Sequence, residues 1–141
     1  MKLKSTCLLT IWTLSTLTYA QVIAPVVAEV RYSEEDMLPV RSTSLTPGSV
    51  ERRRLSATGL PAFFIIGDDL RSRTWLKQRL PTLIKLNAVG LVVNIESKAA
   101  LDNLRQVATG LTLTPVSADD LALRLNLRHY PVLITASSLE Q

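Results

Sequence analysis

The chain has 141 residues, of which 47% are hydrophobic and 20% charged, which suits one domain of ordinary size and no more. Its formal net charge is +4. Without Lys2 and Lys4, which lie in a segment that we expect to be removed, the charge is +4 − 2 = +2. So weak a positive charge does not indicate a nucleic-acid-binding protein.

The first 20 residues have the pattern of a secretory signal peptide. Two lysines precede an uncharged run over residues 5–17, and residues 18–20 end in Ala20, a small residue of the kind that signal peptidase requires. The alternative is a retained membrane anchor. However, the run is shorter than the roughly 20 apolar residues of a spanning helix and is diluted by Thr and Ser. We therefore expect cleavage after Ala20 and contact with the membrane only during export.

Removal of the signal peptide would also remove the cysteine of this chain. Cys7 is the only cysteine and lies near the start of the apolar run, away from the junction where a lipid-modified cysteine would lie. The mature chain would therefore enter an oxidising compartment without a disulfide, a thiolate nucleophile or a sulfur metal ligand. Thiol–disulfide exchange is not expected of it.

Residues 21–59 predict an extended or partly ordered N-terminal arm. One short strand is expected within residues 22–30, but prolines and the acidic residues 34–36 interrupt any longer pattern. Residues 49–55 predict one or two helical turns. The three arginines at 52–54 are interpreted as a solvated basic turn, with contact to an acidic partner or to lipid head groups as the alternative.

Residues 60–141 predict one α/β domain. The wholly apolar run at 62–66 is typical of a strand buried on both faces, and the runs at 89–95 and 111–116 predict two more strands. Asp68 and Asp69 predict the start of a helix in which Pro81 causes a kink or begins a second segment. Ser97 or Glu96 opens a second helix, which Gly110 ends.

A third helix is predicted after residues 117–120, which have the S-x-x-D pattern of a helix cap. Leucines at alternate positions from 121 to 127 favour a strand instead. We choose a helix because the cap is present and because parallel strands need a crossover. The result is β-α-β-α-β-α-β, which favours a mostly parallel sheet covered by helices.

Catalytic constellations are not evident. The chain has one histidine, no Gly-rich phosphate loop and no nucleophile elbow. The two acidic pairs, at 68–69 and 119–120, each lie at a predicted helix start, where capping explains them better than metal binding or acid–base chemistry. We take His129 as a loop residue and predict no catalytic, metal or cofactor site.

Residues 121–135 resemble the helix, X-Pro loop and strand that precede the peptide-binding face of thioredoxin-like domains. In that family the loop proline is cis, and the residue before it offers its backbone to an extended peptide. The alternative is a trans proline that simply opens a strand. The resemblance makes His129, Tyr130 and Pro131, together with the turn at Gly67 and Asp68, candidate peptide-binding residues. A typical domain of this kind has a further strand and helix, whereas only residues 136–141 follow here, so we expect that part to be absent and one sheet edge to be open.

Over nearly its whole length, the chain resembles a small family of exported proteins encoded on bacterial integrating conjugative elements. The resemblance rests on PAFFIIGDDLRSRTWLKQRLP, on VGLVVNIESKAALDNLRQVATGLTLTPVSADDLALRLNLRHYPVLIT and on the ending SLEQ. Residues 61–135 are also distantly similar to the TrbC pilus-assembly proteins of F-type conjugation systems, which have a thioredoxin-like domain without a redox pair. The resemblance implies a periplasmic accessory component of a type IV secretion system, with no catalytic residue to assign.

Two classes of function follow. The first is a non-enzymatic interaction module that holds a segment of a pilus or channel subunit, with other conjugation proteins as partners and no direct contact with nucleic acid. The second is a periplasmic redox enzyme or chaperone of the thioredoxin type, which the missing cysteines disfavour. A membrane-tethered structural protein is a weaker alternative, if the signal peptide is not cleaved.

Overall fold

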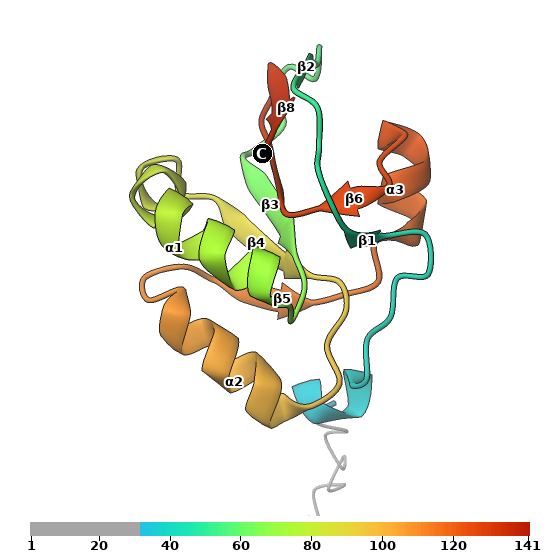
Figure 1. Ribbon diagram of the computed structural model, residues 1–141, viewed down its shortest axis with the longest axis vertical. Coiled ribbons are helices and arrows are strands. Elements are labelled where there is room, and N and C mark those ends of the chain that lie inside the picture. Colours follow the sequence, from blue (N-terminus) through green and yellow to red (C-terminus); the bar gives the residue numbers. More distant parts are fainter. Residues whose placement is uncertain (1–31) are drawn as a thin grey trace, which may run out of the picture. The chain divides into compact units, whose positions relative to one another are not determined.

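The computed structural model describes residues 32–141 (Figure 1). The predicted signal peptide, its cleavage site after Ala20 and the strand expected within residues 22–30 lie outside the described residues. The described part of the chain belongs to one compact unit. It is a mixed α/β domain with three α-helices, one short 3-10 helix and two β-sheets.

The main sheet has six strands in the order β2-β8-β7-β3-β4-β5. Only β3–β4 and β4–β5 are parallel, whereas β3–β7, β7–β8 and β8–β2 are antiparallel, so the prediction of a mostly parallel sheet is wrong. Strand β7 runs opposite to β3, and the short turn after β7 can join it only to an antiparallel strand, β8. The strands are Arg53–Arg54 (β2), Phe63–Ile66 (β3), Val89–Val92 (β4), Leu113–Pro115 (β5), Val132–Ile134 (β7) and Ser138–Glu140 (β8).

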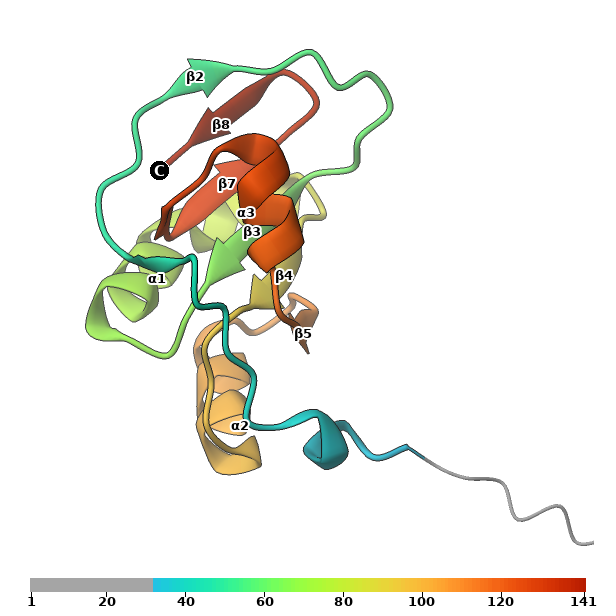
Figure 2. The ribbon, with the colours of Figure 1, turned by 90° about the vertical axis from the view of Figure 1, so that its right-hand side faces the viewer.

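Helices cover both faces of this sheet (Figures 1 and 2). On one face, α1 (Leu70–Lys85) and α2 (Lys98–Val107) pack on Phe64 and Ile66. On the other face, α3 (Asp119–Leu125) packs in a second apolar cluster that includes Ile65. Strand β3 contributes to both clusters because successive side chains of a strand point to opposite faces. This explains why its apolar run is unbroken.

Two of the three helices begin as predicted. The side chains of Asp69 and Ser97 cap α1 and α2, each accepting a hydrogen bond from the backbone N–H three residues later, at 2.9 and 3.2 Å. The helix α3 is present, but its N-cap is Ala118 and no side chain caps it, so the predicted S-x-x-D cap is wrong. Helix α1 continues through Pro81, which therefore does not begin a second segment.

Residues 32–59, expected to form an arm, lie against the domain as short elements. A 3-10 helix comes first, an isolated bridge then joins Val40 to Ile95, and two short strands follow. These elements are η1 (Glu34–Met37), β1 (Thr46–Pro47) and β2. Strand β1 pairs in parallel with β6 (His129–Tyr130) to form the second, two-stranded sheet.

Two predictions about short segments are wrong. The structure has no helical turn over residues 49–55, because Arg53 and Arg54 pair with β8 and Leu55 N donates to Ser137 O at 2.9 Å. Residues after the proline-led strand were expected to supply no further strand. They form β8, which is antiparallel to β7 and is itself covered by β2.

Candidate functional site

The backbone of the predicted binding loop is already paired within the chain. The N–H groups of Thr46 and Gly48 donate to the carbonyl oxygens of Arg128 and Tyr130, both at 3.0 Å. The Tyr130-Pro131 peptide bond is cis. Residues 42–48, which we call the inserted segment, therefore lie where the thioredoxin-like resemblance places an extended peptide.

Asn94 fastens the inserted segment to the end of β4. Its Oδ1 accepts a hydrogen bond from Ser42 N at 2.9 Å, and its Nδ2 donates to Leu45 O at 3.3 Å and to Tyr130 Oη at 3.0 Å. Ser42 Oγ in turn accepts from Ala118 N at 2.9 Å. One partly buried amide thus joins the segment to the aromatic ring of the loop.

Asp119 holds the turn of the inserted segment. Its carboxylate accepts hydrogen bonds from the backbone N–H groups of Ser44 and Thr43, at 2.9 and 3.2 Å, and from the Ser44 hydroxyl. The hydrogen bonds from Ser44, with those from Thr43 and Ser117, lower the pKa of Asp119 below its ordinary value. Asp119 was predicted to cap α3. Its side chain instead accepts hydrogen bonds from Thr43 and Ser44, which lie more than seventy residues earlier in the chain.

Apolar burial adds to these hydrogen bonds. Leu45 is 2% exposed and packs in the same cluster as Leu127, Tyr130 and Ala122. Burying a leucine side chain is worth about 1.5–3 kcal/mol. The inserted segment is therefore held by its core side chain as well as by its backbone.

Tyr130 packs directly on the turn before α1. An added Cβ on Gly67 would lie 2.6 Å from Tyr130 Cε2, so only glycine allows the ring to approach this closely. Gly67 N donates to Ser72 Oγ at 3.0 Å, and Ser72 Oγ donates to Asp69 Oδ2 at 2.8 Å. Burial raises the pKa of Tyr130, although the hydrogen bond from Asn94 opposes this shift.

A groove of about 800 Å³ lies on the other side of the loop, between α1 and Pro131. Trp75 and Gln141 line it, together with Leu70, which is 79% exposed. Gln141 Nε2 donates to Gly48 O at 2.8 Å and to Pro131 O at 3.0 Å, which fixes the groove wall to the inserted segment.

The five predicted site residues do not form one cluster. Gly67 and Tyr130 are in contact, and Asp68 shares a hollow of about 210 Å³ with Tyr130 but pairs with Arg73. Pro131 lines the groove described above.

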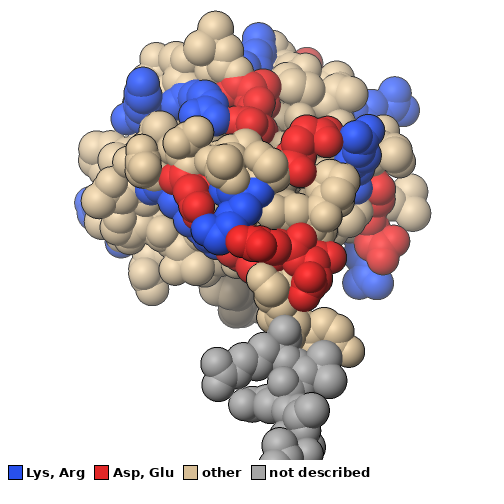
Figure 3. All heavy atoms as spheres, turned by 90° about the horizontal axis from the view of Figure 1, so that it is seen from below, with Lys and Arg blue, Asp and Glu red and all other residues tan. Residues whose placement is uncertain are grey.

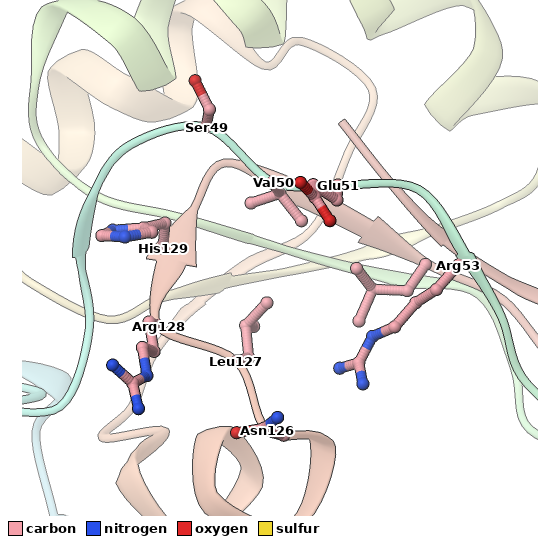
Figure 4. A pocket seen from close by; sticks show the side chains of 9 residues that line it. Ser49, Val50, Glu51, Arg53, Asn126, Leu127, Arg128 and His129 are labelled. Carbon is pink, nitrogen blue, oxygen red and sulfur yellow. The ribbon is translucent and has the colours of Figure 1, made fainter.

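His129 faces the inserted segment instead of the Gly67 turn. Its Nδ1 lies 3.1 Å from Thr46 Oγ1. It also lines a pocket of about 390 Å³ between β2 and β6, with Arg53 and Arg128 at opposite sides and Leu127 between them (Figure 4).

The sequence analysis missed Asn94, Ser42 and Gln141. A signal existed for Asn94, because it directly follows an apolar strand of the parallel part of the sheet, and polar groups at that end of such strands commonly form sites. Ser42 and Gln141 have no comparable signal, because their roles depend on distant contacts. Ser42 contacts Asn94, more than fifty residues away, and Gln141 contacts Gly48, more than ninety residues away.

Within residues 32–141, no group of three or more His, Cys, Asp or Glu side chains is placed to hold a metal ion. In the same part of the chain, no helix has the length and apolar character needed to cross a bilayer. What the site does offer is paired backbone, a partly apolar groove and charged strand edges.

These features define a mixed α/β domain in which the inserted segment pairs with the backbone of the loop before Pro131. The chain belongs to the family DUF2859, described as proteins of unknown function, whose family model matches residues 15–139. Comparison with the curated proteins and with the solved structures found no match.

Proposed function

We propose that this protein is a non-enzymatic, periplasmic accessory component of the conjugative type IV secretion system of an integrating conjugative element. It acts by binding another protein of that machine during pilus or channel assembly. The cellular setting comes from the resemblance to exported conjugative-element proteins. The observation that carries the binding role is the groove beside Pro131, where Trp75 and the exposed Leu70 lie next to hydrogen-bonding groups.

A thioredoxin-like ancestry is part of this proposal. In its favour are the proline that precedes β7, the helix α1 between the parallel strands β3 and β4, and the antiparallel strand β8 after β7. The terminal helix of such domains has no counterpart among residues 32–141. The competing function, a thioredoxin-type redox enzyme or chaperone, is disfavoured because the chain after residue 20 contains no cysteine.

The partner segment is expected in the groove and not on the Tyr130 backbone. The carbonyl oxygen of Tyr130 already accepts from Gly48 N, so a peptide could use it only by displacing the inserted segment. The groove instead offers an apolar side chain of the partner a place between Leu70 and Trp75, with Arg71 and Arg79 at its rim.

A pair of matched leucine variants tests this function. Leu70 and Leu123 are 79% and 81% exposed, both lie in helices, and only Leu70 lines the groove. Because Gln forms helices about as well as Leu, neither Leu→Gln change should alter folding. If a partner buries Leu70, losing about 1.5–3 kcal/mol of burial weakens binding at least tenfold.

The measurement is transfer frequency from donor cells that carry the element with this gene deleted and then restored. Deletion should reduce transfer, the wild type and Leu123→Gln should restore it, and Leu70→Gln should not. Normal transfer after deletion would refute the conjugative role. Equal transfer with both variants would refute the groove as the binding site.

The location of the protein is tested separately by fractionation and N-terminal sequencing. We expect a periplasmic species that begins at Gln21. A full-length species held in the inner membrane would favour the membrane-tethered alternative.

A further inference from the structure

The two edges of the main sheet are protected to very different degrees. At the β5 edge, Leu113 and Pro115 point their backbone groups away from β4. Arg105 Nη2 donates to Leu113 O at 2.8 Å, and Pro115 has no N–H to offer. This edge is therefore closed to a further strand.

The opposite edge, β2, has no such protection. Arg53 pairs with Leu139 of β8, and Leu55 N donates to Ser137 O. Since alternate residues of a strand direct their backbone groups to opposite sides, the N–H and C=O groups of residues 52, 54 and 56 point away from β8. Strand β2 is the last strand of the sheet on this side, so within the described residues these groups have no neighbouring strand.

The side chains of this edge are strongly basic. Arg52, Arg53 and Arg54 are all exposed. Arg52 forms an ion pair with Glu140 at 3.3 Å, whereas Arg53 and Arg54 have no ion pair with any residue of the described part of the chain.

Two hollows lie next to these arginines. On the α3 face, Arg53 and Arg128 flank the pocket of about 390 Å³, in which Glu51 is the one acidic lining residue (Figure 4). A second hollow, of about 870 Å³, is lined by residues 52–56 with Ser137 and Ser138. Acidic side chains are prominent at the opposite end of the domain, with basic side chains interspersed (Figure 3).

We propose that the outer edge of β2 binds an extended acidic segment of a partner protein, which adds to the sheet as a seventh strand. Its backbone pairs with residues 52, 54 and 56, and its carboxylates lie on the α3 face of the sheet beside Arg53. Charged edge strands commonly prevent sheets from pairing with one another. The three consecutive arginines would repel the same edge of a second copy of this chain and so prevent the two edges from pairing. The same positive charges would favour an acidic strand.

The probe is an eight-residue peptide of alternating Val and Glu, labelled for fluorescence anisotropy and added to the whole purified chain. Two peptides serve as controls: one with Lys in place of Glu, and one with Pro in place of Val. The Pro peptide keeps the charge and loses alternate N–H groups and strand propensity. Amide hydrogen exchange of residues 52, 54 and 56 is measured with and without each peptide.

We expect the Val-Glu peptide alone to bind and to slow exchange of those three amides. Arg53→Glu should weaken binding about tenfold, because one attraction becomes a repulsion, and Arg54→Glu, on the opposite face of β2, should weaken it less. Lys77→Glu, the same charge change on the exposed surface of α1, should have little effect.

Three results would overturn the proposal. The first is no binding of the Val-Glu peptide, or binding without protection of the three amides. The second is equal binding of the Pro peptide, which would indicate charge attraction without strand addition. The third is arginine-dependent binding to phosphatidylglycerol vesicles in the absence of peptide binding, which would assign the edge to a lipid surface.

Discussion

Replacing Asn94 by Ala should weaken the attachment of the inserted segment to the domain. The change removes three hydrogen bonds, from Ser42 N, to Leu45 O and to Tyr130 Oη, and leaves those groups in partly buried positions. A typical hydrogen bond contributes about 0.5–1.5 kcal/mol, and water can reach part of this region. We therefore expect the free energy of unfolding to fall by about 2–3 kcal/mol.

Urea unfolding followed by far-UV circular dichroism measures this loss. Asn103→Ala is the matched control, because Asn103 is exposed within α2, where alanine is the better helix former. Hydrogen exchange should also become faster at Ser42, Thr46 and Gly48 in the Asn94 variant. Equal stability of the two variants, with unchanged exchange at these amides, would show that Asn94 does not fasten the segment.

Three further predictions concern neighbouring contacts. Gly67→Ala should destabilise the fold by about 1–3 kcal/mol because its methyl group meets the Tyr130 ring, and thermal unfolding measures this. The pKa of Asp119 is lowered on folding, so its contribution to stability is complete above about pH 4 and is lost as pH falls through the lowered pKa. Urea titrations should therefore show a larger acid-dependent loss for the wild type than for Asp119→Asn, and equal losses would contradict the assignment. Arg105→Lys should weaken the bidentate contact with Glu34, because a lysine cannot reproduce the guanidinium fork, and faster amide exchange in η1 would reveal this.

The central layers of the fold could be predicted from local pattern. Strand β3 is an unbroken apolar run between Pro61 and Gly67, and the starts of α1 and α2 are marked by Asp69 and Ser97. Such signals depend on burial and on capping within a few residues. For this reason they need no knowledge of the rest of the chain.

Elements stabilised by distant partners could not be predicted in the same way. Strand β2 consists of two exposed arginines, a composition that favours no strand, and it exists because β8 presents a partner edge. The inserted segment is rich in Ser and Thr and resembles a linker until Asn94 and Asp119 are seen beside it. Of the candidate site residues, Gly67 and Tyr130 are in contact, whereas His129 and Tyr130 face different hollows because successive residues of a strand point to opposite sides.

The position of the inserted segment decides which surfaces remain for a partner. The segment is tethered at both ends, so its effective concentration at β6 is in the millimolar range or above, and an outside peptide must exceed that to displace it. It also buries Leu45, so displacement exposes an apolar side chain in addition to breaking hydrogen bonds. Competition of this kind makes the backbone of Tyr130 the least accessible part of the loop. The two surfaces proposed for a partner, the groove beside Pro131 and the outer edge of β2, do not require displacement of the inserted segment.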